Sequence, residues 1–160
     1  MADSALSAPE RRFLEELNQR GVRYLVVGVG AAVLQGATTA TQDVDLWFES
    51  IDDARIGEAA RAVGGAWLAG GIGMRPPAIG GETLGDRFDV VVHMHGLRSF
   101  AAEYDASKEM IVDGVPLRVL PLERIIESKR AVGRPRDIAQ IPALEEALAA
   151  LREEESRSRL

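Results

Sequence analysis

The sequence predicts an α/β (α+β) domain in which helices flank a mixed β-sheet and the carboxyl end is helical. Three observations predict this class: β-rich segments alternate with helical ones in the first half, a hairpin signal spans residues 110–120, and two helical segments follow it. Strands that alternate with helices indicate a sheet covered by helices. We expect a single domain over residues 1–160, with its core in residues 22–120 and its carboxyl-terminal helices in residues 121–154.

The composition is that of a folded chain and excludes several kinds of site. Hydrophobic residues make up 46% and charged residues 28%, which is enough apolar material for a core. The absence of cysteine excludes a disulfide framework, a thiolate zinc site and a cysteine nucleophile. The net charge of -6 disfavours electrostatic binding of nucleic acid over a broad surface. Residues 1–9 lack a secretory pattern and no apolar run could span a membrane, so we expect a cytoplasmic protein without membrane contact.

The first helix and the first strand have clear sequence boundaries. Ser7 can cap the helix, Pro9 suits its first turn, and Glu10 stands where a capping box needs an acid. Gly21 ends the helical pattern. Residues 23–27 are β-rich and are closed by a glycine, which predicts a short buried strand.

The next segments continue the alternation of helix and strand. Residues 30–36 are apolar and alanine-rich, which predicts a helix of about two turns. Residues 43–48 alternate with period two and predict a strand. Residues 52–63 return to helical periodicity, with Asp52 or Asp53 as the expected cap.

The middle and the end of the chain are less uniform. Residues 64–85 are rich in glycine and predict mostly loop, with a short strand around residues 66–68. Residues 88–94 are again strand-like. The β-branched runs around Asp113-Gly114 predict a hairpin. Two helices are expected over residues 121–132 and 135–154, followed by fraying of the charged residues 152–160.

The glycine-containing turn after the first strand is not that of a dinucleotide-binding domain. Gly28-Val29-Gly30 follows a strand and precedes a helix, as in that fold. However, the third glycine of the G-x-G-x-x-G pattern falls at Val33, whose side chain would obstruct helix packing. A Walker A loop is also absent, since no Gly-Lys-Ser/Thr follows.

Three aspartates are the chemically informative residues. Asp43 and Asp45 lie two apart on a predicted strand, so their carboxylates share a face. Like charges side by side are costly unless cations such as Mg²⁺ or Mn²⁺ neutralise them. Asp89 begins the later strand, in a run that should otherwise be buried. Alternatively, the Asp-x-Asp pair arises by chance: Asp43 caps a turn, Asp45 is exposed and Asp89 caps a strand end.

The glycine turn, the short helix, the Thr-x-Asp-x-Asp segment and the later strand aspartate together resemble the DNA polymerase β-like nucleotidyltransferase superfamily. The carboxyl-terminal part is similar to its small bacterial members, the minimal nucleotidyltransferases and the AbiEii-type toxin relatives. The likeness covers about Val22 to Leu151. The segments that carry it are residues 27–36, 41–46, 88–91, 122–129 and 133–137.

The resemblance implies a nucleotidyltransferase fold and metal-dependent transfer of a nucleoside monophosphate from an NTP to a hydroxyl acceptor. Asp43, Asp45 and Asp89 would be the catalytic carboxylates and the ligands of Mg²⁺ or Mn²⁺. The acceptor implied is a tRNA, a protein or a small molecule. The nucleotide-binding residues implied are Gly28, Val29, Gly30, Thr41, Lys129 and Arg134. For the two cations, a solvated helix face is the alternative.

One departure from the family pattern leaves two functions open. Val29 stands where the family has a second glycine or a serine, and it offers the phosphates only its backbone amide. One hypothesis is therefore an active nucleotidyltransferase, with a place in a toxin–antitoxin system among its candidate roles. The other is a catalytically weak or inactive antitoxin or protein-interaction module, whose partner would be a cognate toxin or antitoxin protein.

Overall fold

The computed structural model describes residues 5–70 and 75–160. It begins with α1 (Ala8–Gln19), whose start is the predicted capping box. The Ser7 hydroxyl accepts from the amide of Glu10, and the Glu10 carboxylate accepts from the amide of Ser7. Phe13, Leu14 and Leu17 form the buried face of this helix.

A five-stranded mixed sheet forms the centre of the fold, in the order β5-β2-β1-β7-β6. Antiparallel pairs join β1 to β2 and β6 to β7, and parallel pairs join β1 to β7 and β2 to β5. All four residues of β1 are buried, because this central strand is covered on both faces. The strands are β1 (Tyr24–Val27), β2 (Val44–Phe48), β5 (Phe88–Val91), β6 (Lys108–Val112) and β7 (Val115–Val119).

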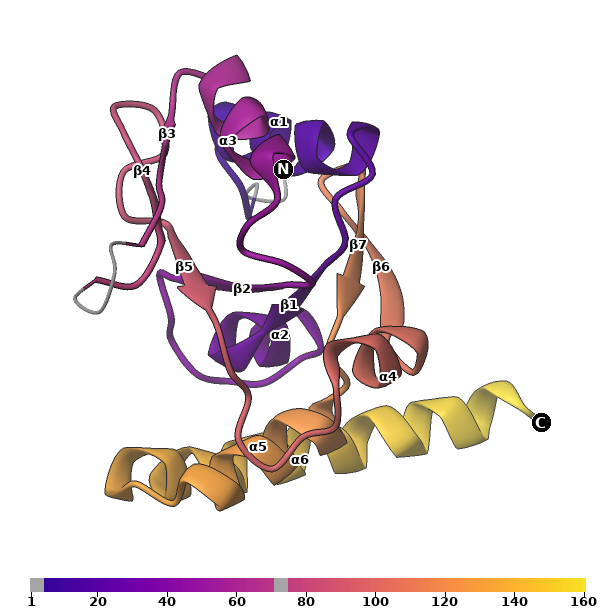
Figure 1. The fold of residues 1–160 in the computed structure, drawn as a ribbon. Coiled ribbons are helices and arrows are strands. Elements are labelled where there is room, and N and C mark those ends of the chain that lie inside the picture. The colour runs from indigo at the N-terminus through magenta and orange to yellow at the C-terminus, as the bar shows by residue number, and fades with distance from the viewer. Residues whose placement is uncertain (1–4, 71–74) are drawn as a thin grey trace.

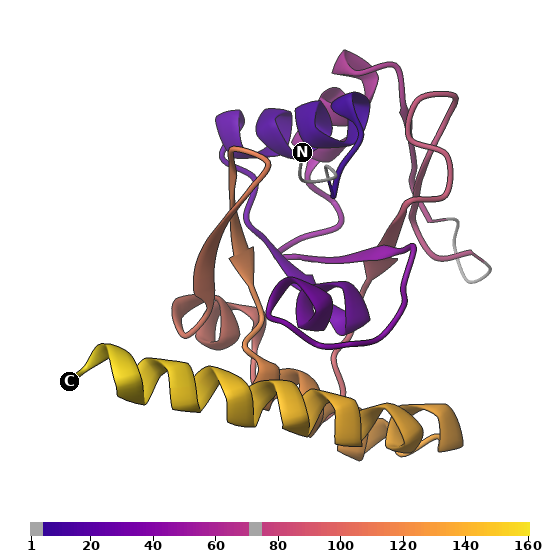
Figure 2. The same cartoon turned by 180° about the vertical axis from the view of Figure 1, so that it is seen from behind.

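Helices cover the sheet on two sides (Figure 1). The pair α1 and α3 lies on one side, and α2, α5 and α6 lie on the other, a division that Figure 2 shows from behind. The longest helix, α6, runs beneath the whole domain and extends past it at the carboxyl end. The helices after α1 are α2 (Gly28–Leu34), α3 (Ala54–Ala62), α4 (Phe100–Asp105), α5 (Leu122–Val132) and α6 (Pro135–Ser158).

A small second sheet lies next to β5. It consists of β3 (Ala66–Leu68) and β4 (Ala78–Gly80), which pair antiparallel. The sequence predicted the first of these strands within the glycine-rich segment and missed the second. Part of that segment, residues 71–74, lies outside the described residues.

The helical elements differ from the sequence prediction at three places. Helix α2 begins at Gly28, two residues earlier than expected. Helix α4 was not predicted; Ser99 caps it by accepting from the amide of Ala102. Helix α6 continues to Ser158, so the expected fraying from residue 152 is wrong. Residues 152–158 contain mostly Arg and Glu, which have high helix propensity, and this favours continuation of the helix.

A buried glutamine holds α5 in place relative to the sheet. The Gln35 side chain, which follows α2, donates to the carbonyls of Ala31 and Leu120 at 3.0 and 2.9 Å. Its carbonyl oxygen accepts from the amide of Leu122, the first residue of α5, at 3.2 Å. The glutamine therefore satisfies backbone groups on both sides of the connection between β7 and α5.

Of the helices in residues 5–70 and 75–160, none combines the length and the apolar character that a membrane span requires.

Candidate functional site

The register of the sheet brings two of the predicted aspartates side by side. Strands β2 and β5 are parallel neighbours, and Asp45 pairs with Asp89. Asp45 also lies opposite Val27, the last residue of β1, directly before the glycine turn. Asp43 stands just before β2 and is exposed. The acidic residues thus lie near one another where β1 ends and where β2 and β5 begin.

Gly28 makes room for the Asp45 carboxylate. A Cβ atom placed on Gly28 would lie 2.1 Å from Oδ2 of Asp45, and the glycine has a φ of +68°. A Cβ on Gly30 would lie 3.0 Å from the backbone oxygen of Asp43. Both glycines therefore stand where α2 closely approaches the acidic segment, and Gly28 alone adopts the left-handed conformation that side chains disfavour.

Burial and neighbouring negative charges raise the pKa of two of these aspartates, Asp45 and Asp89. Burial, then the charges of Asp89 and Asp43, raise the pKa of Asp45 to about 6, while the positive charge of Lys129 opposes the rise. Burial and the charges of Asp43 and Asp86 also raise the pKa of Asp89. A raised carboxyl pKa means that the ionised form is disfavoured at this place. A bound cation would relieve that cost.

The donor atoms suit a hard divalent cation, although the three carboxylates do not converge. Mg²⁺ and Mn²⁺ prefer carboxylate oxygens, which Asp43, Asp45 and Asp89 supply. Within residues 5–70 and 75–160, no group of three His, Asp or Glu side chains is arranged to hold a metal ion. The residues thus fit a cation in charge and in chemistry, and coordination by all three would require their side chains to turn toward one another.

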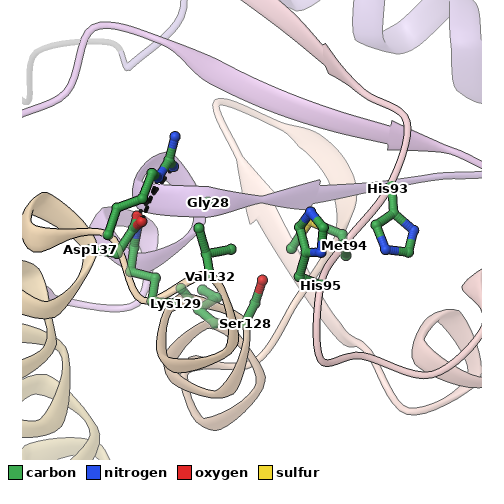
Figure 3. A pocket seen from close by; sticks show the side chains of 10 residues that line it. Gly28, His93, Met94, His95, Ser128, Lys129, Val132 and Asp137 are labelled. Atoms are coloured by element: carbon green, nitrogen blue, oxygen red, sulfur yellow. Dashed lines mark hydrogen bonds and ion pairs between the residues drawn. The ribbon is translucent and has the colours of Figure 1, made fainter.

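A cavity of about 270 Å³ lies beside the acidic segment (Figure 3). It is bounded by the start of α2, the loop after β5, one face of α5 and the first turn of α6. The face of α5 presents residues at positions i, i+3, i+4 and i+7, the spacing of a single helix surface. The lining residues are Gly28, His93, Met94, His95, Ile125, Ser128, Lys129, Val132, Arg134 and Asp137.

Two predicted cations line this cavity and share one carboxylate. Lys129 Nζ lies 3.5 Å from Oδ1 of Asp137, and Arg134 Nε donates to Oδ2 at 2.7 Å. Asp137 is only 3% exposed. The hydrogen bond from Arg134 is the main cause that lowers the pKa of Asp137 below its ordinary value. Asp137 therefore pairs with Arg134, and Lys129 joins this pair.

The structure separates the other predicted nucleotide-binding residues from this cavity. Gly30 and Thr41 line a second, mostly apolar cavity of about 100 Å³, together with Asp43. The Thr41 hydroxyl engages the backbone of Asp43 in its own turn. Val29 is half-buried in the first turn of α2. Of the six residues, the larger cavity brings together Gly28, Lys129 and Arg134.

Sequence reasoning missed some residues of the cavity. Ser128 was not singled out, although its side chain lines the cavity and the residue is only 7% exposed. Its spacing from Ile125 and Val132, on the face that carries Lys129, is the signal that could have identified it. His93 and His95 both line the cavity, with ring centroids 4.6 Å apart in an edge-to-face arrangement.

Comparison with known proteins identifies the fold. No protein-family model and no curated protein sequence matches the chain. Among solved structures, ANT(2'')-Ia in complex with adenylyl-2''-tobramycin matches with a TM-score of 0.54 and 18% identity, covering 92% of this chain and 92% of that one. A solution structure of the antibiotic-resistance factor ANT(2'')-Ia matches with a TM-score of 0.54 and 18% identity, over 94% and 93% of the two chains.

A third solved structure is an antigenic nucleotidyltransferase-like protein from Paracoccidioides brasiliensis. It matches with a TM-score of 0.51 and 17% identity, over 95% of this chain and 91% of that chain. At such low identity the likeness concerns the fold. The predicted fold class is confirmed: the chain has the mixed sheet, flanking helices and helical carboxyl end of nucleotidyltransferase-fold proteins.

Proposed function

We propose that this protein is a metal-dependent nucleotidyltransferase that moves a nucleoside monophosphate from an NTP to a hydroxyl acceptor. The observation that carries the proposal is the pairing of Asp45 with Asp89 on adjacent strands, beside a cavity that is lined by two cationic side chains. Phosphoryl transfer needs two charge environments: acidic side chains that hold a cation, and basic side chains that bind the phosphates.

The residues divide into an acidic and a basic set around Gly28. Asp45 and Asp89, with Asp43 nearby, would hold Mg²⁺ or Mn²⁺. Such a cation would neutralise charge on the triphosphate and lower the pKa of the attacking hydroxyl. Lys129 and Arg134 line the cavity and would bind the phosphates. Gly28 would let the backbone approach them.

Asp89 is the carboxylate best suited to accept the proton of the acceptor hydroxyl. Its side chain is exposed, so an acceptor can reach it. Burial and the charges of Asp43 and Asp86 raise its pKa in the absence of a cation.

The acceptor that we propose first is a small polyhydroxyl molecule. The ANT(2'')-Ia structure contains an adenylylated tobramycin, and this chain matches almost the whole length of that protein. The net charge of -6 also suits a cationic acceptor better than a polynucleotide. A tRNA end or a protein hydroxyl, including that of a cognate toxin, would present the same nucleophilic oxygen.

The test is transfer of label from [α-³²P]ATP and the other labelled NTPs in the presence of Mg²⁺ or Mn²⁺. The acceptors offered separately would be an aminoglycoside panel, total tRNA and a protein extract. We expect transfer by the wild type and none by Asp45→Asn. Asp105→Asn is the matched control, because this exposed aspartate in α4 makes only a 4.0 Å contact with Arg23. Absence of both transfer and NTP binding by the wild type would leave the interaction-module hypothesis in its place.

A further inference from the structure

Two cations from different segments converge on the buried Asp137 carboxylate. Asp137 lies in the first turn of α6, Lys129 in the last turn of α5, and Arg134 at the joint between these helices. Besides its 2.7 Å bond through Nε, Arg134 places Nη2 3.4 Å from Oδ1 of Asp137. Like charges repel, and the carboxylate between the lysine and the arginine offsets that repulsion.

Asp137 orders these cations without using up their hydrogen-bond donors. A guanidinium has five N–H donors and an ammonium has three. Asp137 takes the Nε and one Nη2 donor of Arg134 and a single donor of Lys129. The Arg134 side chain is 56% exposed, and both cations line the cavity. Their remaining donors are therefore open to a ligand.

In the described part of the chain, Asp137 is the carboxylate in salt-bridge contact with this pair, and the charge of Lys129 also acts on Asp45. Lys129 and Arg134 each form their salt bridge with Asp137 alone. Figure 3 shows Asp137 and Lys129 together at one end of the cavity, away from His93. The buried carboxylate of Asp137 therefore fixes the positions of both cationic side chains at this end of the cavity.

We propose that Asp137 is a positioning residue that holds Lys129 and Arg134 as a preformed pair for the outer phosphates of the bound nucleotide. This inference rests on the proposed function, because it requires a nucleotide in the cavity. The lowered pKa of Asp137 keeps the carboxylate ionised through the neutral pH range, so the pair is present before the nucleotide arrives. Preformed side chains bind more tightly, because less conformational entropy is lost on binding.

The test measures how the affinity depends on the number of phosphates. Binding of ATP, ADP and AMP to the purified full chain is measured by isothermal titration calorimetry with Mg²⁺. We expect Asp137→Asn to weaken ATP binding about tenfold, the effect of disordering two long side chains. ADP binding should weaken less, and AMP binding should not change. In an Arg134→Gln background, Asp137→Asn should have a smaller effect on ATP.

Glu145→Gln is the matched control for this substitution. Glu145 of α6 pairs with Arg130 of α5, so the control also removes one negative charge and one ion pair between the same two helices. It lies outside the cavity, and its Kd for ATP should equal that of the wild type. If Asp137→Asn does not fold, Asp137→Glu keeps the charge and displaces the carboxylate. It should lose ATP affinity in the same phosphate-dependent way.

Three results would overturn the proposal. Equal losses for ATP and AMP would mean a general structural role, and unchanged or tighter ATP binding would mean that Asp137 does not organise the pair. An Asp137→Asn effect of full size in the Arg134→Gln background would mean that it does not act through Arg134. A wild type that binds none of the nucleotides overturns the proposed function itself, so the two failures are distinguishable.

Discussion

Substitution of Gly28 by alanine tests the contact between the glycine turn and Asp45. Two costs are expected. A non-glycine residue at a φ of +68° costs about 1–2 kcal/mol. The new Cβ would also lie 2.1 Å from Oδ2 of Asp45, so the carboxylate must leave its rotamer, at a further cost of about 0.5–1.5 kcal/mol. The free energy of unfolding should therefore fall by roughly 1.5–3.5 kcal/mol in total.

The chain contains a glycine that isolates the first cost. Gly85 has a φ of +56°, and a Cβ placed on it meets nothing within 4 Å. Urea unfolding of Gly85→Ala should therefore report the cost of the left-handed backbone alone. The excess loss in Gly28→Ala over Gly85→Ala should then report the displacement of Asp45.

A double-mutant cycle decides whether that excess comes from Asp45. The Asp45→Ala variant removes the carboxylate, and its Cβ lies 3.4 Å from a Cβ placed on Gly28, an ordinary contact distance. In the Asp45→Ala background, Gly28→Ala should cost no more than Gly85→Ala. Persistence of the full excess in that background would refute the argument, because something other than Asp45 would then occupy the space.

Three further predictions concern charge and buried polar groups. Burial alone would raise the pKa of Glu103, but hydrogen bonds from Arg124 and Arg98 outweigh it and lower the pKa. The stability that Glu103 contributes is present above its unfolded pKa of about 4.3 and is lost as the pH falls through the lower folded value. Urea unfolding should thus show Glu103→Gln less stable than the wild type at neutral pH, with a difference that shrinks in acid. For Asp45 the sign is opposite: its pKa is raised to about 6, so its ionisation costs stability as the pH rises through that value. Without divalent cations, Asp45→Asn should be about 1–2 kcal/mol more stable near pH 8 after allowance for solvent screening, and Mn²⁺ should raise the melting temperature of the wild type only. An identical response of both proteins to Mn²⁺ would mean that Asp45 is not a metal ligand. Finally, Gln35→Leu should lower the free energy of unfolding by about 1–3 kcal/mol for each backbone group it leaves unpaired, as thermal unfolding can show.

The sequence predicts those parts of the fold that depend on neighbouring residues. The capping box of Ser7 and Glu10 is local, and so is the hairpin turn, where Asp113 and Gly114 both have positive φ. Helix α4 was missed because its stability comes from distant contacts. It buries Glu103, whose carboxylate pairs with Arg98 just before the helix and, 21 residues further along the chain, with Arg124 of α5. Such a pairing cannot be read from a six-residue segment.

The candidate site was predictable in its residues and less so in its arrangement. The Thr-x-Asp-x-Asp segment and Asp89 are visible in the sequence, but the register that sets Asp45 beside Asp89 follows from the pairing of non-consecutive strands. Thr41 is predicted to contact a nucleotide, and in the structure its hydroxyl accepts from the backbone amide of Asp43, a common local bond for threonine. Ser128 was overlooked because its spacing from Ile125 and Val132 indicates a shared helix face, while the cavity that this face lines is visible only in the folded chain.

The number of residues between α5 and α6 determines how the cavity residues of the two helices face each other. Gly133 ends α5 in the left-handed conformation, and Arg134 already caps α6. With only these two residues between the helices, the backbone fixes which face of α6 meets α5. Insertion of one residue after Pro135 would turn the rest of α6 by about 100°, and Asp137 would face away from Lys129. Homologous proteins that keep this cavity should therefore vary in the glycine-rich segment of residues 64–85 far more freely than in the spacing from Lys129 to Asp137.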